Sequence, residues 1–252
     1  MSNISRRKLI TTGLAAAAGV AGLGAAAKLA GARGLIPPDA DVPFGAGESL
    51  TYAAQRLLNR HSRAQEFSRE QISKKPFAND AGTLPAEFAA LEAGRFAGWR
   101  VTIDGMVARP KMYSVTELKL GVSRSQITMV ACEEGWDYIA EWTGIPLESL
   151  LLDVGALPAA RYVVYQSIQP DWYESIDMDD ATHPQTILAY GMNGADLPVP
   201  FGGPLRMRVP RQLGYKSVKY ITRITVTDDV KKFGKGTGGV DSDNGYAWYA
   251  GI

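Results

Sequence analysis

The spacing of hydrophobic positions changes at about residue 99. Before that point, apolar residues from Leu50 to Leu58 recur every three or four positions, which predicts an amphipathic helix over residues 49–59. A second short helix is predicted over residues 86–94, where Gly94 would end it. From Trp99 onward the apolar positions alternate with a period of two, which is the spacing of strands.

The second part of the chain is therefore predicted to form a sheet. Two hairpins are expected, one with its turn at Asp104-Gly105 and one at Asn193-Gly194, because these pairs favour turns with positive φ. A capping box at 114–117 predicts a short helix toward Leu120, and another short helix is expected over 147–152. Hairpin strands are expected over residues 99–103, 106–108, 186–191 and 197–199, and further strands over 127–131, 161–167, 205–209 and 220–227. The fold class predicted is α+β, mixed and sheet-rich with short helices, in one domain over residues 49–252.

Composition narrows the function classes. The 252 residues are 46% hydrophobic and 21% charged, which is typical of a globular domain and excludes a disordered or fibrous chain. The net charge is only +1, so the protein has no overall field that would attract nucleic acid. A single cysteine and two histidines exclude an intrachain disulfide and a multi-histidine metal centre.

The first 32 residues differ from the rest. They contain four of the 27 basic residues and no acidic residue. Arg6-Arg7 precedes an uncharged, weakly hydrophobic run over residues 9–27, and small residues follow at 30–32. This pattern is typical of a twin-arginine signal peptide, so we expect residues 1–32 to direct export to the periplasm. The alternative is an uncleaved signal that anchors the protein to the periplasmic side of the inner membrane. Residues 33–48, rich in Gly, Pro and Asp, are predicted to be a linker.

Cys132 is the first candidate for chemistry, because it follows a predicted buried strand and precedes 133–136 (EEGW). A free cysteine is most often an inert core residue. As a nucleophile it would need His61 or His183 as a base, and its two acidic neighbours disfavour the thiolate. As a redox sensor it lacks a second cysteine. As a single soft ligand to a metal held mainly by a cofactor, it needs no further protein ligand.

A basic segment is the second candidate. Residues 206–223 hold six basic residues and no acidic one, which predicts a local anion site, because arginine binds phosphate through paired hydrogen bonds. Backbone N–H groups of 214–217 would add to it as a nest. The alternative is a solvated basic strand face that carries Arg206 and Arg208. Nucleic acid is not expected as a partner, because no basic stripe extends elsewhere after the signal segment.

The remaining polar motifs indicate less. Residues 172–180 contain four carboxylates, but the glycine and the bidentate glutamate of a calcium loop are missing. His183-Pro184 is predicted to be a fixed turn, and His61 to lie at a helix C-terminus.

From about residue 99 to 252, the chain resembles the sulfite oxidase family of molybdopterin-dependent oxidoreductases. Exported bacterial members are similar to it, including catalytic subunits of protein-methionine-sulfoxide reductases. The resemblance implies a sulfite-oxidase-type molybdopterin-binding fold and molybdopterin, the molybdenum cofactor. The segments that carry it, in order, are 131–136 (ACEEGW), 142–147 (WTGIPL), 173–177 (YESID), 183–186 (HPQT), 203–206 (GPLR) and 214–216 (GYK).

The resemblance implies roles for individual residues. Cys132 would be the thiolate ligand to molybdenum, and Tyr173 is the candidate catalytic hydroxyl that orients the substrate. Glu133 is a candidate proton relay. Together with the basic segment, the resemblance predicts these cofactor-binding residues: Asn79, Ser167, Arg206, Arg211, Lys216, Ser217, Val218 and Lys219. Phe201 and Glu133 depart from the family pattern, which has Asn or His and valine there, and both departures bear on substrate identity.

The function implied is an exported oxotransferase that moves an oxygen atom between a substrate and Mo(VI/IV), most simply by reducing a sulfoxide-like substrate. Sulfite oxidation is the alternative within the family. A haem-containing membrane subunit or a cytochrome would exchange the electrons, and a monomeric core is expected. Hypotheses from other classes are a cysteine hydrolase that pairs Cys132 with His183 and a non-enzymatic periplasmic binding protein.

Overall fold

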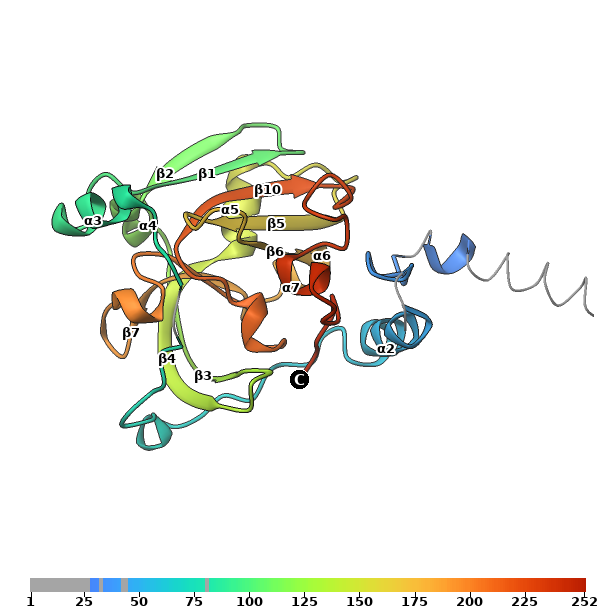
Figure 1. The fold of residues 1–252 in the computed structure, drawn as a ribbon, viewed down its shortest axis with the longest axis horizontal. Helices are drawn as coiled ribbons and strands as arrows, with labels where there is room; N and C mark the ends of the chain where they lie inside the picture. The colour runs from blue at the N-terminus through green and yellow to red at the C-terminus, as the bar shows by residue number, and fades with distance from the viewer. Residues whose placement is uncertain (1–27, 32–33, 42–44, 80–81) are drawn as a thin grey trace, which may run out of the picture.

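The computed structural model describes residues 28–31, 34–41, 45–79 and 82–252. Two sheets dominate these residues, and Figure 1 shows the first sheet above the second. The first sheet has the order β2-β1-β10-β5-β6 and consists of β1 (Arg100–Gly105), β2 (Lys111–Ser114), β5 (Tyr162–Ser167), β6 (Tyr173–Asp177) and β10 (Ile221–Thr227). The second has the order β3-β4-β7-β8 and consists of β3 (Arg124–Ala131), β4 (Asp137–Pro146), β7 (Ile187–Met192) and β8 (Ala195–Asp196), with β9 (Arg206–Arg208) paired to β7.

The helices are short and lie around the sheets, which confirms the predicted fold class. Ser114 caps α4 as predicted, since its Oγ accepts a hydrogen bond from the N–H of Glu117 at 3.2 Å, and the Glu117 carboxylate accepts one from the N–H of Ser114 at 2.7 Å. The α-helices are α2 (Gly45–Leu58), α3 (Ala86–Ala93), α4 (Val115–Leu120), α5 (Leu147–Val154), α6 (Met178–Ala181) and α7 (Val240–Asp243), and the 3₁₀ turns are η1 (Arg69–Gln71), η2 (Val199–Phe201) and η3 (Gly214–Lys216).

One of the two predicted hairpins forms. Asn193 and Gly194, with φ of 52° and 80°, make the turn between β7 and β8. The turn predicted at Asp104-Gly105 does not form there, because β1 continues through Gly105 alongside the parallel strand β10; the chain turns back only between Gly105 and Lys111, where β2 begins antiparallel to β1. The N–H of Met106 donates to the carbonyl of Val226 at 2.7 Å, which carries the chain along β10.

The main core lies between the two sheets, and the alternation of β5 shows how it is built. Val163 and Tyr165 point into this core together with Leu188 of the second sheet. The residues that alternate with them, Tyr162 and Val164, point to the other face of the first sheet, where Trp248 of the C-terminal segment covers them. Each such side chain contributes roughly 1.5–3 kcal/mol when it is fully buried.

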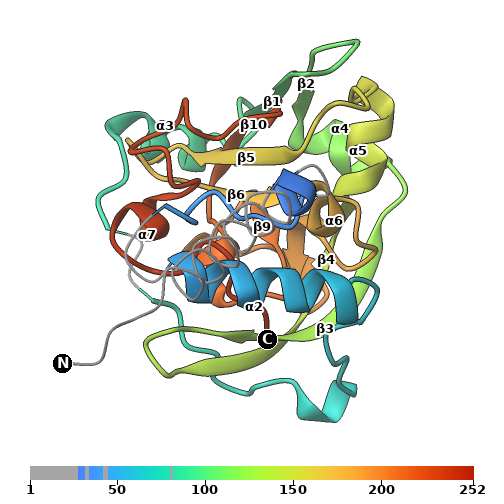
Figure 2. The same cartoon turned by 90° about the vertical axis from the view of Figure 1, so that its right-hand side faces the viewer.

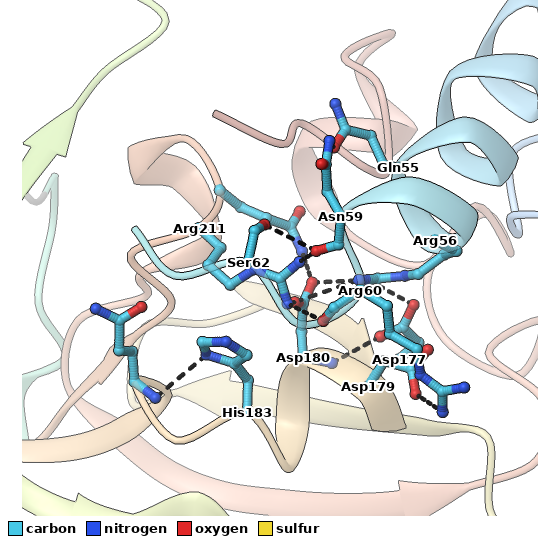
Figure 3. A network of polar contacts seen from close by, with 12 residues as sticks. Gln55, Arg56, Asn59, Arg60, Ser62, Asp177, Asp179, Asp180, His183 and Arg211 are labelled. Atoms are coloured by element: carbon cyan, nitrogen blue, oxygen red, sulfur yellow. Dashed lines mark hydrogen bonds and ion pairs between the residues drawn. The ribbon is translucent and has the colours of Figure 1, made fainter. Parts of the chain in front are cut away.

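Helix α2 packs against the rest of the protein with the side opposite to its leucines, which were predicted to be buried. Its leucines lie outside, with Leu50 74%, Leu57 69% and Leu58 81% exposed. The buried side carries Tyr52 and Arg56. The guanidinium of Arg56 binds the carboxylates of Asp177 and Asp180 (Figure 3), and Figure 2 shows α2 lying across this side of the molecule. Two buried charge pairs therefore decide the orientation of the helix.

The predicted signal segment, residues 1–32, lies outside the described residues except for 28–31. Within the part of the chain that the structure describes, no helix combines the length and the apolar character needed to cross a membrane.

Candidate functional site

A cavity of about 580 Å³ is lined by Arg206 of β9, by residues of loops that follow strands of both sheets, and by residues of the C-terminal segment. Its volume is within the range of small-molecule sites. The loops after β3 and β5, the beginning of β9, η3 and α7 contribute to its wall. Seven residues predicted from the sequence line it, namely Asn79, Cys132, Glu133, Arg206, Ser217, Val218 and Lys219.

Cys132 is placed by a tight turn at the end of β3. Its N–H donates to the carbonyl of Trp136 at 2.9 Å, and its carbonyl accepts from the N–H of Gly135 at 3.1 Å. Gly135 has a φ of 91°, a conformation that a residue with a Cβ rarely adopts. This turn places the half-buried Cys132 on the wall of the cavity.

The acidic neighbours of Cys132 keep its sulfur protonated in the absence of a metal. The thiol donates to Glu133 Oε2 at 3.3 Å, and Glu134 Oε2 lies 3.8 Å from the sulfur. Burial and then the hydrogen bond and charge of Glu133 raise the pKa of Cys132 to about 12. Such a thiol is a poor nucleophile at neutral pH, whereas a coordinated metal deprotonates it. The geometry therefore favours a ligand over a nucleophile.

Arg206 brings a guanidinium to the same cavity. Its Nε donates to the carbonyl of Ser217 at 2.9 Å, and its Nη1 donates to the carbonyl of Phe201 at 3.0 Å. Its Nη2 makes no hydrogen bond to any of the described residues, and no carboxylate among them forms an ion pair with Arg206. Phe201, which lacks the polar side chain of the family pattern, thus still orients Arg206 through its backbone.

Arg208 places a second positive charge near that of Arg206. It is 1% exposed, and its Nη1 donates to the hydroxyl of Ser217 at 2.9 Å. Its Nε is buried without a hydrogen-bond partner among the described residues, and none of their carboxylates pairs with it. Burial, and then the charge of Arg206, lower the pKa of Arg208 to about 9. The predicted alternative of a solvated basic strand face is wrong, because both guanidinium groups are buried.

Residues 217–219 close the wall beside Arg206. The ammonium of Lys219 donates to the carbonyls of Pro200 at 2.7 Å and Asn79 at 2.9 Å, so Asn79 contributes a backbone group to this side. The predicted nest at 214–217 does not form as expected, because the N–H groups of Lys216 and Ser217 already donate to the carbonyls of Leu213 and Gly214. A Cβ on Gly214 would lie 3.3 Å from the carbonyl oxygen of Ala131, so this turn packs tightly against the end of β3.

The donors around the cavity fit molybdopterin. Cys132 offers one soft sulfur, which suits a metal whose other ligands come from a cofactor. Arg206 and Lys219 offer the charged donors that bind phosphate, and no carboxylate among the described residues forms an ion pair with Arg206. The thiol and the cationic groups belong to the wall of a single cavity.

Two predicted residues lie in an adjoining cavity of about 740 Å³. Gln169 and Trp172 line both cavities and separate them. Ser167 lies on the far side, where its hydroxyl accepts from the N–H of Gln169 at 3.1 Å. Tyr173 also lies there, and its hydroxyl donates to Asp243 Oδ2 at 2.9 Å. Burial and the hydrogen bond to Asp243 raise the pKa of Tyr173. The structure thus places Tyr173 in the adjoining cavity and not on the wall that carries Cys132.

Two other predicted residues serve buried ion pairs. Arg211 Nη1 donates to Asp180 Oδ1 at 3.0 Å, in the network that also holds Arg56 (Figure 3). Lys216 Nζ donates to Glu174 Oε2 at 2.6 Å, and neither side chain is exposed. Neither residue lines the cavity, because buried carboxylates already bind both charges.

The histidines lie away from Cys132. His183 sits in the turn after α6, where its Nδ1 accepts from the N–H of Gln185 at 3.2 Å, and it does not line the cavity (Figure 3). Burial lowers the pKa of His183 to about 4. The structure therefore does not pair Cys132 with a histidine base. Asp177 and Asp180, which the sequence placed in the acidic segment, bind Arg56 rather than an ion.

Sequence reasoning missed part of the wall. Glu134 and Trp136 carried a signal, because they belong to the segment around Cys132. Asp241 carried none, because it lies in a glycine-rich tail whose position depends on packing across the whole domain.

Comparison with known proteins supports the assignment of the fold. The family model described as the oxidoreductase molybdopterin binding domain matches residues 89–233. A putative protein-methionine-sulfoxide reductase subunit YedZ1 of Azospira oryzae is 35% identical over 182 residues, which are 72% of this chain and 66% of that protein. The protein-methionine-sulfoxide reductase catalytic subunit MsrP of Ralstonia nicotianae is 34% identical over 158 residues, or 54% of this chain and 48% of that protein.

A solved structure shows the same fold. The sulfane dehydrogenase SoxCD from Paracoccus pantotrophus matches with a TM-score of 0.51 at 18% sequence identity, over 68% of this chain and 46% of that chain. The matches thus span between about half and two thirds of the lengths of these proteins. The family model covers more than half of the present sequence. The chain belongs to the family of oxidoreductases with a molybdopterin-binding domain, the family predicted from its sequence motifs.

Proposed function

We propose that the chain is an exported molybdenum oxotransferase that reduces a sulfoxide-like substrate. One observation carries the proposal: a thiol suited to metal ligation and a buried guanidinium with no carboxylate partner among the described residues line the same cavity. When bound, the cofactor supplies the two-electron change between Mo(VI) and Mo(IV) that accompanies transfer of an oxygen atom.

The chain's own residues bind and orient. Cys132 would ligate the metal, and the turn through Gly135 fixes its sulfur. Arg206 and Lys219 would hold the phosphate side of the pterin, with Ser217 and Val218 as the wall between them. Asn79 positions Lys219 through its carbonyl.

The relatives' names support the choice of substrate, because both are described as protein-methionine-sulfoxide reductase subunits. Sulfite oxidation is the alternative. Methionine sulfoxide with a chemical reductant, and separately sulfite with a cytochrome acceptor, should be offered to the metal-loaded protein. Turnover of the sulfoxide is expected, and turnover of sulfite alone would reverse the assigned direction. A hydrolase would instead remain active after metal removal and lose activity on alkylation of its thiol.

Export and the electron partner belong to the same proposal. The twin-arginine pair at Arg6-Arg7 and the weakly hydrophobic run after it support export of a protein that folds around its cofactor in the cytoplasm. A haem-containing membrane subunit or a cytochrome would exchange electrons with the site.

Elemental analysis tests the assignment of the metal. The parent protein and Cys132→Ser should be made in a host that synthesises molybdopterin, and the molybdenum content of each measured. We expect close to one metal per parent chain and a large loss in Cys132→Ser. Arg206→Met should also lose metal with its cofactor, whereas Arg223→Met, an exposed residue paired with Asp104, should not. A parent protein without molybdenum would refute the proposal.

A further inference from the structure

Asp241 is a buried carboxyl on the wall of the cavity that contains Cys132. The residue is 9% exposed, and its Oδ2 is buried without a hydrogen-bond partner among the described residues. Its backbone N–H donates to Glu174 Oε1 at 2.9 Å, which fixes the beginning of α7 against β6. A buried carboxylate oxygen that accepts no hydrogen bond is costly, whereas a protonated carboxyl can donate its proton instead.

A buried ion pair below Asp241 sets its environment. Lys216 Nζ donates to Glu174 Oε2 at 2.6 Å, and both side chains are fully buried. Burial first, and then the charge of Glu174 and its contact with the Asp241 side chain, raise the pKa of Asp241 to about 7. Lys216 acts in the opposite direction, and Glu133 beside Cys132 adds a further rise.

The other titratable groups around Asp241 do not neutralise it. The hydroxyls of Tyr215, on η3, and Tyr165, on β5, are close enough for Asp241 to raise their pKa values, and both stay protonated. On α7 itself, Asp243 turns away, since its carboxylate accepts from the N–H of Lys235 at 2.9 Å. Asp241 is thus a group that both holds and releases a proton near neutral pH.

The net reduction of a sulfoxide consumes protons that such a group can supply. Reduction of a sulfoxide, R₂S=O + 2H⁺ + 2e⁻ → R₂S + H₂O, breaks the S–O bond and consumes two protons. The two electrons come from the external reductant, which is a haem protein in the proposed function and a reduced viologen in the test below. Oxidation of sulfite by water releases two protons in the opposite direction. Glu133 and Glu134 are exposed, whereas Asp241 is shielded within the wall.

We propose that Asp241 is the acid–base group of this cavity. It gives a proton to the oxygen atom that the substrate loses during reduction, and it accepts a proton when the reaction runs in the oxidative direction. Glu174 and Lys216 are the positioning residues that hold it. The second proton comes from water, and solvent reprotonates Asp241 after each turnover. This inference rests on the proposed function and assigns the group that moves the proton.

Asp241→Asn tests the proposal in the metal-loaded protein. With methionine sulfoxide and a reduced viologen, the parent kcat should fall as the pH rises through about 7, because the donor must be protonated. Asp241→Asn should lose this dependence and be slower by about 100-fold at pH 6, with unchanged molybdenum content and KM. Asp241→Glu should restore part of the pH dependence. Asp153→Asn, on α5 and outside the cavities described, is the matched control and should behave as the parent.

Two readouts do not depend on turnover. A carboxylic-acid infrared band that titrates near pH 7 should be present in the parent and missing in Asp241→Asn. The variant should also gain stability over the parent as the pH rises from about 4 to 7, because only the parent must then bury a charge. An equal rate and pH profile in Asp241→Asn would overturn the proposal. If the metal-loaded parent reduces no sulfoxide and oxidises no sulfite, the proposed function fails, and the infrared band alone then decides for or against the titrating carboxyl.

Discussion

Replacing Asp180 with asparagine should destabilise the protein far more than its place on a four-residue helix suggests. Asp180 is fully buried, and its carboxylate accepts from Arg56 Nη2 at 2.8 Å, Arg211 Nη1 at 3.0 Å and Gln212 Nε2 at 2.6 Å (Figure 3). The substitution keeps the shape of the side chain but removes its charge. One of its two acceptor oxygens becomes an amide that faces hydrogen-bond donors.

The size of the destabilisation depends on the ion pairs that remain in the variant. Asp177 still binds Arg56 at 2.6 Å, so one guanidinium keeps a carboxylate. Arg211 loses its carboxylate and stays buried. Breaking a buried ion pair by removing one partner costs about 3–5 kcal/mol, and the retained pair at Arg56 places the expected loss at the lower end, about 3 kcal/mol. For a domain of this size that corresponds to a fall in Tm of about 6–12 °C.

Urea and thermal unfolding at pH 7 measure this loss, and Asp179→Asn is the control on the neighbouring residue. Asp179 pairs with Arg60 at 2.6 Å, but the side chains are 29% and 56% exposed, so its loss should cost at most about 1 kcal/mol. Burial acts to raise the pKa of Asp180, but Arg56 and Arg211 outweigh it and hold the pKa below its usual value. The stabilisation is therefore present above the ordinary aspartate pKa and is lost as the pH falls below it, which narrows the gap between parent and variant in acid. Equal losses for the two variants would refute the reasoning.

Three further predictions follow from other residues. Arg208→Met should leave the stability of the cofactor-free protein unchanged or higher, because it removes a buried charge that has no carboxylate partner among the described residues. The same variant should lose the anionic cofactor about ten times more readily, as measured by dissociation of the cofactor, and retention equal to that of the parent would contradict this role. Because burial lowers the pKa of His183 to about 4, the parent should lose stability as the pH falls from about 6.5 to 4. His183→Gln should flatten this part of the plot of stability against pH, and an unchanged plot would show that another group causes the loss. Replacing both Arg6 and Arg7 with lysine should retain the protein in the cytoplasm of a twin-arginine-competent host, as measured by cell fractionation, and undiminished export would exclude that route.

The local elements were predictable from the sequence. The capping box at Ser114 and the turn at Asn193-Gly194 depend on residues within a few positions of one another, and both form as predicted. The turn predicted at Asp104-Gly105 lies further along the chain, because these residues pair with β10, more than a hundred residues later, and nothing in the local pattern indicates this partner.

Strand β6 was not predicted, for a different reason. Strand β6 reads as an acidic loop, because Glu174 and Asp177 interrupt its apolar pattern, yet both are buried. Their charges are matched by Lys216 and Arg56, which lie far away in the chain. The same contacts explain helix α2, whose buried side is chosen by Arg56 rather than by its leucines. Burial of a charge is decided by tertiary partners, and a hydropathy pattern does not contain them.

The same distinction between local and tertiary information applies to the residues of the candidate site. Cys132 and the 217–219 segment could be found, because each stands in a motif or a charge run, and both line the cavity. Tyr173 also stands in a motif, but its hydroxyl points to Asp243 in the adjoining cavity. Asp241 could not be found, since only the packing of α7 against Glu174 brings its carboxyl to the wall.

The basic segment shows why a charge count alone does not locate an anion site. Arg211 and Lys216 are neutralised by buried carboxylates, and Arg223, itself exposed, is paired with Asp104. Arg206 and Arg208 have no such partner among the described residues, although both are buried. Burying two adjacent guanidinium groups is unfavourable unless an anion lies beside them. The positive charges that remain unmatched after the ion pairs are assigned therefore mark the anion site. Arg206 lines the cavity that also contains the single thiol, and Arg208 is buried within the electrostatic influence of Arg206.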